Sequence, residues 1–497
     1  MASQDTRISR RTILIAGGAS AGALALAGGA FWLGTSVSKT LTSGNPTQSS
    51  LPGFGIEPEI LRSSGGKLTV DLVAAYSEIQ IGGKPAKLKT YNGTTPGPTW
   101  MVKPGDVITV NFTNNLGEPT NLHTHGFHVS PAGNSDNVFV EVADGETFTY
   151  QYTLADNHPS APFWYHPHHH GMAADQVFAG LYGAIVVEDT EPIPATKERV
   201  LVLSDISLQT DGNVAGANMM SKMMGREGDI LLLNGQVQPS YASDQNALER
   251  WRIVNSCTSR YMKLSVPGGT ATLLGKDSGR YAQPQKVTEF TLAPGNRADL
   301  LVQLGSEPVS LSYTTVPHPD AMMMGSTQTY TNYPLAQFIP GSTTAATVGA
   351  LPTQTAGPDL RSEAIADARS FTLKMPNMGG MGGMGNMNGG FTINGQAFNM
   401  DVINTSVKLG TVEEWTIIND TTMDHPFHLH VWPMQVLSIG GLVVTAVEYQ
   451  DVVNVPANSR SVIRVHFDKF EGNAVYHCHI LDHEDQGMMG IIEANPA

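Results

Sequence analysis

Apolar and polar residues alternate along much of the chain from residue 67 onward. Ile108, Val110 and Phe112 alternate with polar residues, and residues 148–154 and 463–467 repeat the pattern. A period of two is typical of β-strands that bury one face. Turn sequences such as Pro104-Gly105-Asp106 and Pro294-Gly295-Asn296 interrupt the runs at the intervals expected of sandwiches or barrels. The pattern predicts an all-β chain.

A weak internal repeat suggests how the strands are grouped. Asn-Gly begins at Asn92, Asn234 and Asn394, and 22, 21 and 25 residues later a strand-like run ends in Asn. Such a repeat predicts three copies of one Greek-key β unit. We expect a signal and linker over 1–50, a first domain over 51–190 and a second over 191–350. The third, 351–497, includes a linker and a methionine-rich loop.

Length and composition agree with this division. The chain has 497 residues, room for about three domains. Gly at 52 and Pro at 30 are frequent and charged residues make only 15%, which suits a loop-rich β protein. The net charge of 29 − 44 = −15 would repel a polyanion, so nucleic acid is excluded as a partner.

The N-terminus has the composition of an export signal. Ser9-Arg10-Arg11-Thr12 precedes an uncharged run over 13–34 that is rich in Ala, Gly and Leu. The paired arginines resemble a twin-arginine signal, a route that carries folded proteins. The alternative is a membrane anchor, since 22 residues are just enough to cross a bilayer. The glycines favour a cleaved signal, a periplasmic or other extracytoplasmic location, and no stable membrane insertion afterwards.

Histidines gather in four clusters, two in the expected first domain and two near the C-terminus. They are His123-Thr124-His125, His166-Pro167-His168, His425-Pro426-Phe427-His428-Leu429-His430 and His477-Cys478-His479-Ile480-Leu481-Asp482-His483. Residues i and i+2 of a strand face the same side, so each His-x-His presents two imidazoles together. Eight imidazoles exceed the needs of one ion, which predicts several metals of the copper, zinc, iron or nickel type in a cavity between the first and third domains.

The His477-Cys478-His479 triplet identifies one metal as copper. Strand alternation sends both imidazoles to one face and the thiolate to the other, so Cys478 serves a separate site. With His425, His483 and Met488 as a weak axial partner it forms the ligand set of a blue-copper electron-transfer centre. That use of Cys478 leaves Cys257 as a buried, inert thiol.

A one-electron centre joined through Cys478 to a cluster of three coppers stores four electrons. Four is the number that reduces dioxygen to two waters. The chain is therefore expected to oxidise a reductant one electron at a time and to reduce dioxygen.

The sequence resembles the multicopper oxidases, a family that includes laccases, bacterial cuprous oxidases and bilirubin oxidases. Besides the histidine motifs, the resemblance rests on 95–98 (Thr-Pro-Gly-Pro), Trp164-Tyr165, 294–299 and 487–490. It implies three cupredoxin-like β-barrels and four copper ions. His123 and His428 would bind the type 2 copper. The two type 3 coppers would be held by His125, His166, His168, His430, His477 and His479, and the type 1 copper by His425, Cys478, His483 and Met488.

Some neighbouring residues compete for these roles. His169 and His170 extend the second cluster, but the Trp-Tyr prefix favours His166 and His168 as ligands. Met489 competes with Met488, and the family spacing favours Met488. Oxygen reduction also needs protons. The resemblance makes Glu484 a proton donor residue for residue, and Asp136 is a second candidate; for both, the alternative is a solvated surface acid.

Methionine suggests the reductant. The chain has 21, and five lie in a Gly-rich segment: Met375, Met378, Met381, Met384 and Met387. Shorter runs occur at 219–224 and 322–324. Thioethers select Cu(I), which we therefore favour as substrate; a plain flexible low-complexity loop is the alternative.

Other functions remain to be weighed against this one. A laccase-like oxidase of phenols or aromatic amines would use the same centre without a role in Cu(I) oxidation. A non-catalytic copper-binding or structural protein would lack some of these ligands. A two-domain copper nitrite reductase disagrees with the three apparent domains and with the four His-x-His motifs. Dioxygen and a small reductant are the expected partners, and the protein is expected to be a monomer.

Overall fold

The computed structural model describes residues 55–316, 331–376 and 390–497. Strands make up 52% of the chain and helices 5%, so the predicted all-β class is confirmed. The signal segment, Met378, Met381, Met384, Met387 and the run at 322–324 lie outside the described residues.

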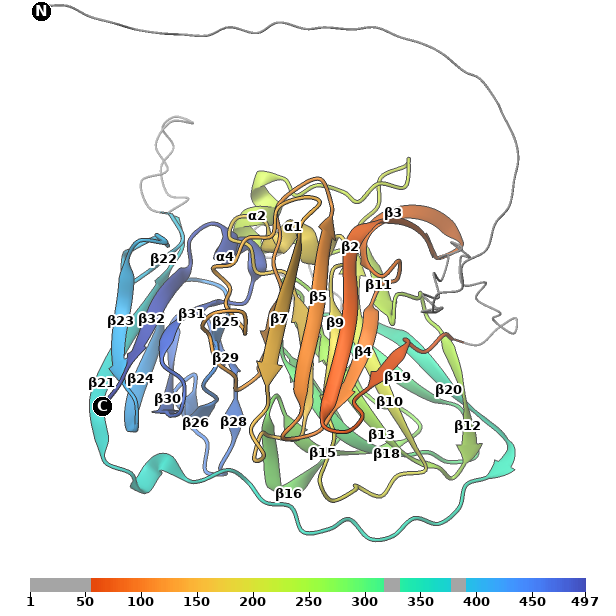
Figure 1. The fold of residues 1–497 in the computed structure, drawn as a ribbon. Coiled ribbons are helices and arrows are strands. Elements are labelled where there is room, and N and C mark those ends of the chain that lie inside the picture. The colour runs from red at the N-terminus through yellow and green to blue at the C-terminus, as the bar shows by residue number, and fades with distance from the viewer. Residues whose placement is uncertain (1–54, 317–330, 377–389) are drawn as a thin grey trace, which may run out of the picture. The chain divides into compact units, whose positions relative to one another are not determined.

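Two sheets are built from residues 60–187. One has the order β1-β4-β9-β8-β6 and the other β3-β2-β5-β7. Figure 1 shows β2, β5 and β7 side by side. The strands are β1 Ile60–Arg62, β2 Lys67–Ile81, β3 Lys84–Tyr91, β4 Gly97–Val102, β5 Val107–Asn115, β6 His123–His125, β7 Thr147–Thr153, β8 Pro162–His166 and β9 Gly183–Val187.

Two further sheets are built from residues 197–344. Their orders are β11-β10-β13-β18-β15-β16 and β12-β20-β19-β14-β17. The strands are β10 Lys197–Ile206, β11 Ile230–Leu233, β12 Ser240–Gln245, β13 Leu248–Asn255, β14 Met262–Ser265, β15 Thr270–Lys276, β16 Gly279–Val287, β17 Glu289–Leu292, β18 Arg297–Gln303, β19 Val309–Thr314 and β20 Asn332–Thr344.

The last two sheets use residues 365–495. Their orders are β22-β21-β24-β30-β26-β27, with β28 beside β26, and β23-β32-β31-β25-β29. The strands are β21 Ile365–Lys374, β22 Thr392–Ile393, β23 Ile403–Lys408, β24 Thr411–Asn419, β25 His425–Leu429, β26 Met434–Ile439, β27 Leu442–Val443, β28 Tyr449–Gln450, β29 Val452–Val455, β30 Ser459–Phe467, β31 Gly472–Cys478 and β32 Met489–Asn495.

The parts of the chain that build these three pairs of sheets, residues 60–187, 197–344 and 365–495, are called the first, second and third stretch. The Asn-Gly dipeptides at Asn92, Asn234 and Asn394 adopt the same conformation in all three stretches. Asn92, Asn234 and Asn394 have φ of 52°, 50° and 54°, and the glycine after each is also left-handed. Two consecutive positive φ values define a tight turn that favours Asn-Gly. Each Asn side chain also accepts a hydrogen bond from a backbone N–H about 20 to 30 residues away, at 2.7 to 2.8 Å. On this recurrence we propose three domains; the boundaries drawn from the sequence stay a prediction.

Each stretch encloses an apolar core of its own, around Trp100, Trp251 and Trp415. The third core also takes in Met223 and Met224 from the second stretch. The helices are short: α1 Ala173–Phe178, α2 Met219–Met224, α4 Leu481–Asp485 and a 3₁₀ turn at Leu360–Ser362. Within the described part of the chain, no helix has the length and apolar character needed to cross a bilayer.

Candidate metal centre

Four strands bring the histidine clusters together. In the first stretch β6 pairs with β8 so that His123 is opposite His166. In the third stretch β25 pairs with β31 so that His428 is opposite His477. The ten clustered histidines are all at most 2% exposed: His123, His125, His166, His168, His425, His428, His430, His477, His479 and His483.

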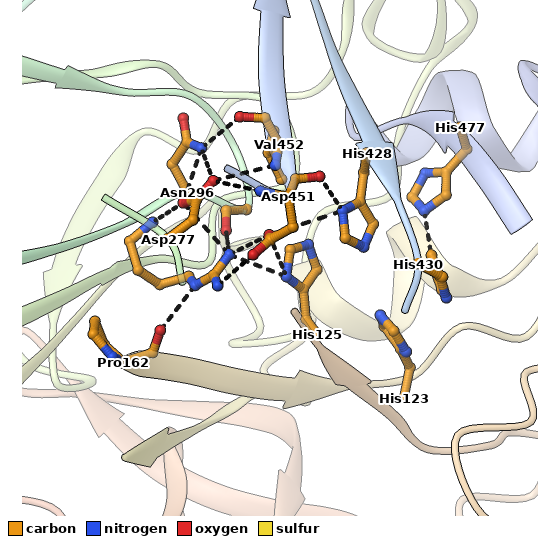
Figure 2. Close-up of polar contacts among 12 residues, drawn as sticks. His123, His125, Pro162, Asp277, Asn296, His428, His430, Asp451, Val452 and His477 are labelled. Atoms are coloured by element: carbon orange, nitrogen blue, oxygen red, sulfur yellow. Dashed lines mark hydrogen bonds and ion pairs between the residues drawn. The ribbon is translucent and has the colours of Figure 1, made fainter. Parts of the chain in front are cut away.

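The imidazole nitrogens fall into compact groups whose atoms all lie within 4.8 Å of one another. The groups are His125, His166 and His479; His168, His430 and His477; and His123, His428 and His430. Together the first two groups contain the six histidines that the resemblance assigns to the type 3 pair, and the structure divides them into two sets of three. Figure 2 shows the rings of His123, His125, His428 and His430 directed into a common space.

The hydrogen bonding of these rings fits a metal cluster. His428 Nδ1 donates to the Asp451 carbonyl at 2.6 Å and His166 Nδ1 to the Pro167 carbonyl at 2.9 Å. A carbonyl only accepts, so Nδ1 carries the hydrogen and Nε2 keeps its lone pair. The Nε2 atoms of His123, His125, His166, His428 and His479 are buried without a hydrogen-bond partner. Unpartnered buried acceptors are costly, and a shared set of them is what copper ligation would satisfy.

The thiol of Cys478 lies in a second, separate group with His425 and His483. Its Sγ is 3.3 Å from His425 Nδ1 and 3.7 Å from His483 Nδ1. The alternation of β31 therefore places the thiol away from the neighbouring imidazoles, as the sequence predicted. Burial raises the pKa of the Cys478 thiol, so a bound cation is needed to form the thiolate. Cys257 is a buried free thiol in the second core.

Met488 and Met489 face different surroundings. Met488 is fully buried in the same core cluster as Cys478, and its carbonyl accepts from the Cys478 N–H at 3.0 Å. Met489 packs with Val475 and Ile491 in another cluster. The placement favours Met488 as the axial partner.

Burial keeps several of the candidate imidazole ligands neutral. It lowers the pKa of His425 to about 3, that of His166 to about 3 and that of His168 to about 4. Neutral imidazole is the form that binds a metal, so these three imidazoles need no deprotonation near neutral pH.

Helix α2 covers the Cys478 group. The Met223 carbonyl accepts a hydrogen bond from His483 Nε2 at 2.9 Å, which leaves Nδ1 of that ring as a lone pair toward Cys478. The Arg226 guanidinium, just after α2, pairs with Asp482 at 2.5 Å and ties the helix to α4. Met219 and Met220 are 67% and 42% exposed on this helix.

Both candidate acids are buried against the histidines. Asp136 is 2.9 Å from His123 Nδ1 and accepts from the Thr124 N–H at 2.8 Å. Burial raises the pKa of Asp136 to about 7. Glu484 is 3.1 Å from His477 Nδ1. Burial raises the pKa of Glu484, but His168 and His477 outweigh it and hold the pKa below its ordinary value. Neither acid is a solvated surface group.

His169 and His170 lie beside the cluster without joining any of the groups above. His169 Nε2 is 2.9 Å from Glu141, and the His170 ring is 4.6 Å from that of Phe398. Both line a pocket of about 110 Å³ that reaches His168.

Sequence reasoning missed Asp451 and its partners. Asp451 is bound by Arg297, whose Nη2 lies 2.7 Å from Oδ2, and its Oδ1 is 3.5 Å from His125 Nδ1. Arg297 Nε also donates to the Pro162 carbonyl at 3.0 Å. A Cβ on Gly126, which has φ +85°, would lie 2.5 Å from that guanidinium, so glycine is required there. The only available signal was the 294–299 motif that contains Arg297.

Comparison with known proteins agrees with this geometry. Residues 73–192 and 370–497 match family models described as multicopper oxidase. The chain is 28% identical to a multicopper oxidase of Staphylococcus haemolyticus, over 81% of this chain and 83% of that protein. It is 27% identical to a laccase of Bacillus subtilis, over 82% and 90%. A Campylobacter jejuni structure described as a multicopper oxidase and metallo-oxidase has 29% identity and a TM-score of 0.77, covering 90% of this chain and 96% of that one. The fold is thus cupredoxin-like.

Proposed function

This chain belongs to the multicopper oxidase family, and we propose from that premise that it couples one-electron oxidation of a small reductant to four-electron reduction of dioxygen to water. Membership makes it a copper oxidoreductase and sets aside the non-catalytic alternative. The proposal is carried by one observation: two groups of three buried imidazoles lie beside a separate Cys478 group.

Four copper ions are proposed, one of type 1, one of type 2 and two of type 3. His425, Cys478, His483 and Met488 would hold the first. His123 and His428 would hold the second. His125, His166 and His479 would hold one type 3 ion, and His168, His430 and His477 the other. Bound copper would supply one-electron redox chemistry at the Cys478 site and dioxygen reduction at the histidine cluster.

Residues of the chain itself connect and orient these sites. Cys478 is bonded along β31 to His477 and to His479 beyond it, so one segment serves both sites. Carbonyls of Asp451 and Pro167 fix the tautomers of His428 and His166. Such partners orient a ligand ring and raise its basicity.

Asp136 is proposed to hold a proton beside the cluster and to deliver it during oxygen reduction. We expect Asp136→Asn to slow oxygen reduction by about 100-fold or more, the usual effect of losing a positioned acid. Copper content should not change, because the asparagine oxygen still accepts from His123 Nδ1. Reoxidation of the fully reduced protein by dioxygen in a single turnover measures the effect.

Asp136→Leu is the matched comparison, since it removes the acceptor as well and should lower copper content. A wild-type reoxidation rate in Asp136→Asn would exclude the proposed proton donor. Glu484, held below its ordinary pKa beside His477, is proposed to accept and relay protons rather than to store one.

Cu(I) is the proposed reductant. Helix α2 supports this, because exposed Met219 and Met220 sit on the helix whose Met223 carbonyl contacts His483. Thioethers select Cu(I). The Met223 carbonyl of the same helix accepts a hydrogen bond from His483 Nε2. This contact would limit direct access of bulky phenols to the His483 ring. Met375, at the start of the methionine-rich segment, packs against the core that contains Cys478.

Oxygen uptake with two reductants tests the Cu(I) role. We expect a variant with leucine at Met219, Met220, Met378, Met381, Met384 and Met387 to lose most Cu(I)-dependent uptake, because the soft ligands are gone while side-chain size is kept. Uptake with a methoxyphenol should persist. Met400→Leu is the control, since this 58% exposed methionine lines the separate pocket beside His168.

Two other outcomes are possible, and the first of them would contradict the Cu(I) proposal. Unchanged Cu(I) turnover would favour the laccase-like alternative, in which phenols or aromatic amines are the reductants. An equal loss with both reductants would mean that the substitutions damaged the Cys478 site itself.

We further propose that the protein is exported and acts as a monomer outside the cytoplasm. The twin-arginine-like sequence at Arg10-Arg11 supports export. That route would carry the chain in a folded state.

A further inference from the structure

The backbone is held in an unusual conformation directly after the candidate ligand His430. Val431 has φ +70°, and the Trp432 N–H donates to the His430 carbonyl at 2.8 Å. A bond from i+2 to i around a residue with positive φ defines a γ-turn of the strained, less common hand. A β-branched residue strongly disfavours that region of φ. The surrounding structure must therefore hold the turn in place.

One side chain from the first stretch reaches this turn. His128 Nδ1 donates to the Val431 carbonyl at 2.9 Å, although the two residues are 303 positions apart. His128 is buried, and its backbone N–H donates to His158 Nε2 at 3.1 Å. Its ring also contacts that of Phe470, with 4.9 Å between centroids. Contacts outside the turn therefore help to fix the position of the His128 ring.

Asp468 completes the contact on the other side of the turn. Its Oδ1 lies 3.1 Å from His128 Nε2, and its backbone carbonyl accepts from Trp432 Nε1 at 3.0 Å. Both ring nitrogens of His128 thus face oxygen acceptors. Burial raises the pKa of Asp468, but the hydrogen bond from His128 leads the effects that bring it below its ordinary value, so the carboxylate is charged.

We propose that His128 is a positioning residue for the trinuclear copper cluster: by holding the Val431 carbonyl, it stabilises the strained turn that sets His430 against His123, His168 and His477. His430 Nε2 lies 3.2 Å from His477 Nε2, and the His123 and His430 rings stack at 4.0 Å. A turn that relaxed would shift His430 away from ligands supplied by the first stretch. The inference rests on the proposed copper ligands.

Two substitutions separate the two hydrogen bonds of His128. The side-chain nitrogen of asparagine occupies the position of Nδ1, whereas that of glutamine occupies the position of Nε2. We expect His128→Asn to retain cluster copper nearly as the wild type does. His128→Gln keeps a donor for Asp468 but loses the bond to Val431, and should lower cluster copper affinity by about 10- to 100-fold.

Copper retained per chain is measured after the loaded proteins are equilibrated with a graded series of a copper chelator. The visible absorption of the Cys478 site, followed in parallel, should be unchanged, since none of the hydrogen bonds described above for this turn involves a ligand of that site. His466→Asn is the matched control, because His466 is an exposed histidine lining the same cleft of about 530 Å³ as His128.

A double-mutant comparison tests the role of the turn itself. Glycine adopts positive φ without strain. We therefore expect His128→Gln to cost less cluster copper in a Val431→Gly background than in the wild type. An equal loss in both backgrounds would overturn the proposal.

The relative loss of cluster copper in His128→Asn and His128→Gln also tests the proposal. If His128→Asn loses cluster copper while His128→Gln keeps it, His128 acts only as an ion-pair link to Asp468 and the proposal is wrong. Loss in His128→Asn alone overturns it even if His128→Gln does not fold. A wild-type protein that holds no cluster copper would instead refute the proposed function.

Discussion

Cys478→Ser is expected to abolish oxidation of every reductant. Serine is a hard oxygen ligand in place of the thiolate that selects copper in this site, so the type 1 ion and its strong visible absorption should be lost. The histidine cluster should keep its copper, because His477 and His479 face away from the thiol. Copper per chain, visible absorption and oxygen uptake together measure the result.

Cys257→Ser is the matched control. Its thiol is also free and buried, but it lies in the second core and in none of the metal-binding groups. Full activity is expected there, apart from a small loss of stability. If Cys478→Ser kept the visible absorption or consumed oxygen with Cu(I), the assignment of Cys478 to the electron-accepting site would be wrong.

Arg297→Leu should be the most destabilising single substitution among these contacts. The guanidinium is fully buried and pairs with Asp451, while its Nη1 is 3.4 Å from Asp277. Removing one partner of a buried ion pair leaves the other charge uncompensated, which costs about 3–5 kcal/mol of the free energy of unfolding. Urea unfolding followed by tryptophan fluorescence measures the change.

A surface ion pair provides the comparison for Arg297. Arg62 lies 2.7 Å from Glu188, with side chains that are 57% and 28% exposed. Arg62→Leu should change stability by about 1 kcal/mol or less, as is usual for exposed pairs. Comparable unfolding midpoints for the two variants would show that the buried network around Asp451 does not hold the stretches together.

Local patterns were enough to predict the strands and to pick out the four histidine clusters as ligand candidates. Strand alternation depends only on residues two apart, so the opposite directions of Cys478 and His477 followed from three consecutive residues. The Asn-Gly turns likewise carry their own conformational preference, and the structure has them at Asn92, Asn234 and Asn394. The assignment of the cluster histidines to copper types, however, came from family resemblance, and their division into groups of three came from the structure.

Long-range partners could not be predicted in the same way. Asp451 lies beside His125 of the cluster, and its partner Arg297 comes from the second stretch. The Met223 carbonyl contacts His483 across 260 positions, and a backbone atom leaves no trace in the identity of its residue. For Asp136 the sequence supplied a carboxylate, while its burial and its contact with His123 came only from the folded chain.

The placement of the cluster ligands has a consequence for how the protein is made. His123 to His168 are synthesised long before His477 and His479, which come at the end of β31 and just after it. A growing chain therefore holds only part of the cluster until β31 has been made. Loading of the complete cluster must follow synthesis of β31, and a chain arrested before this strand would leave the imidazoles of the first stretch without the ligands that the third stretch supplies.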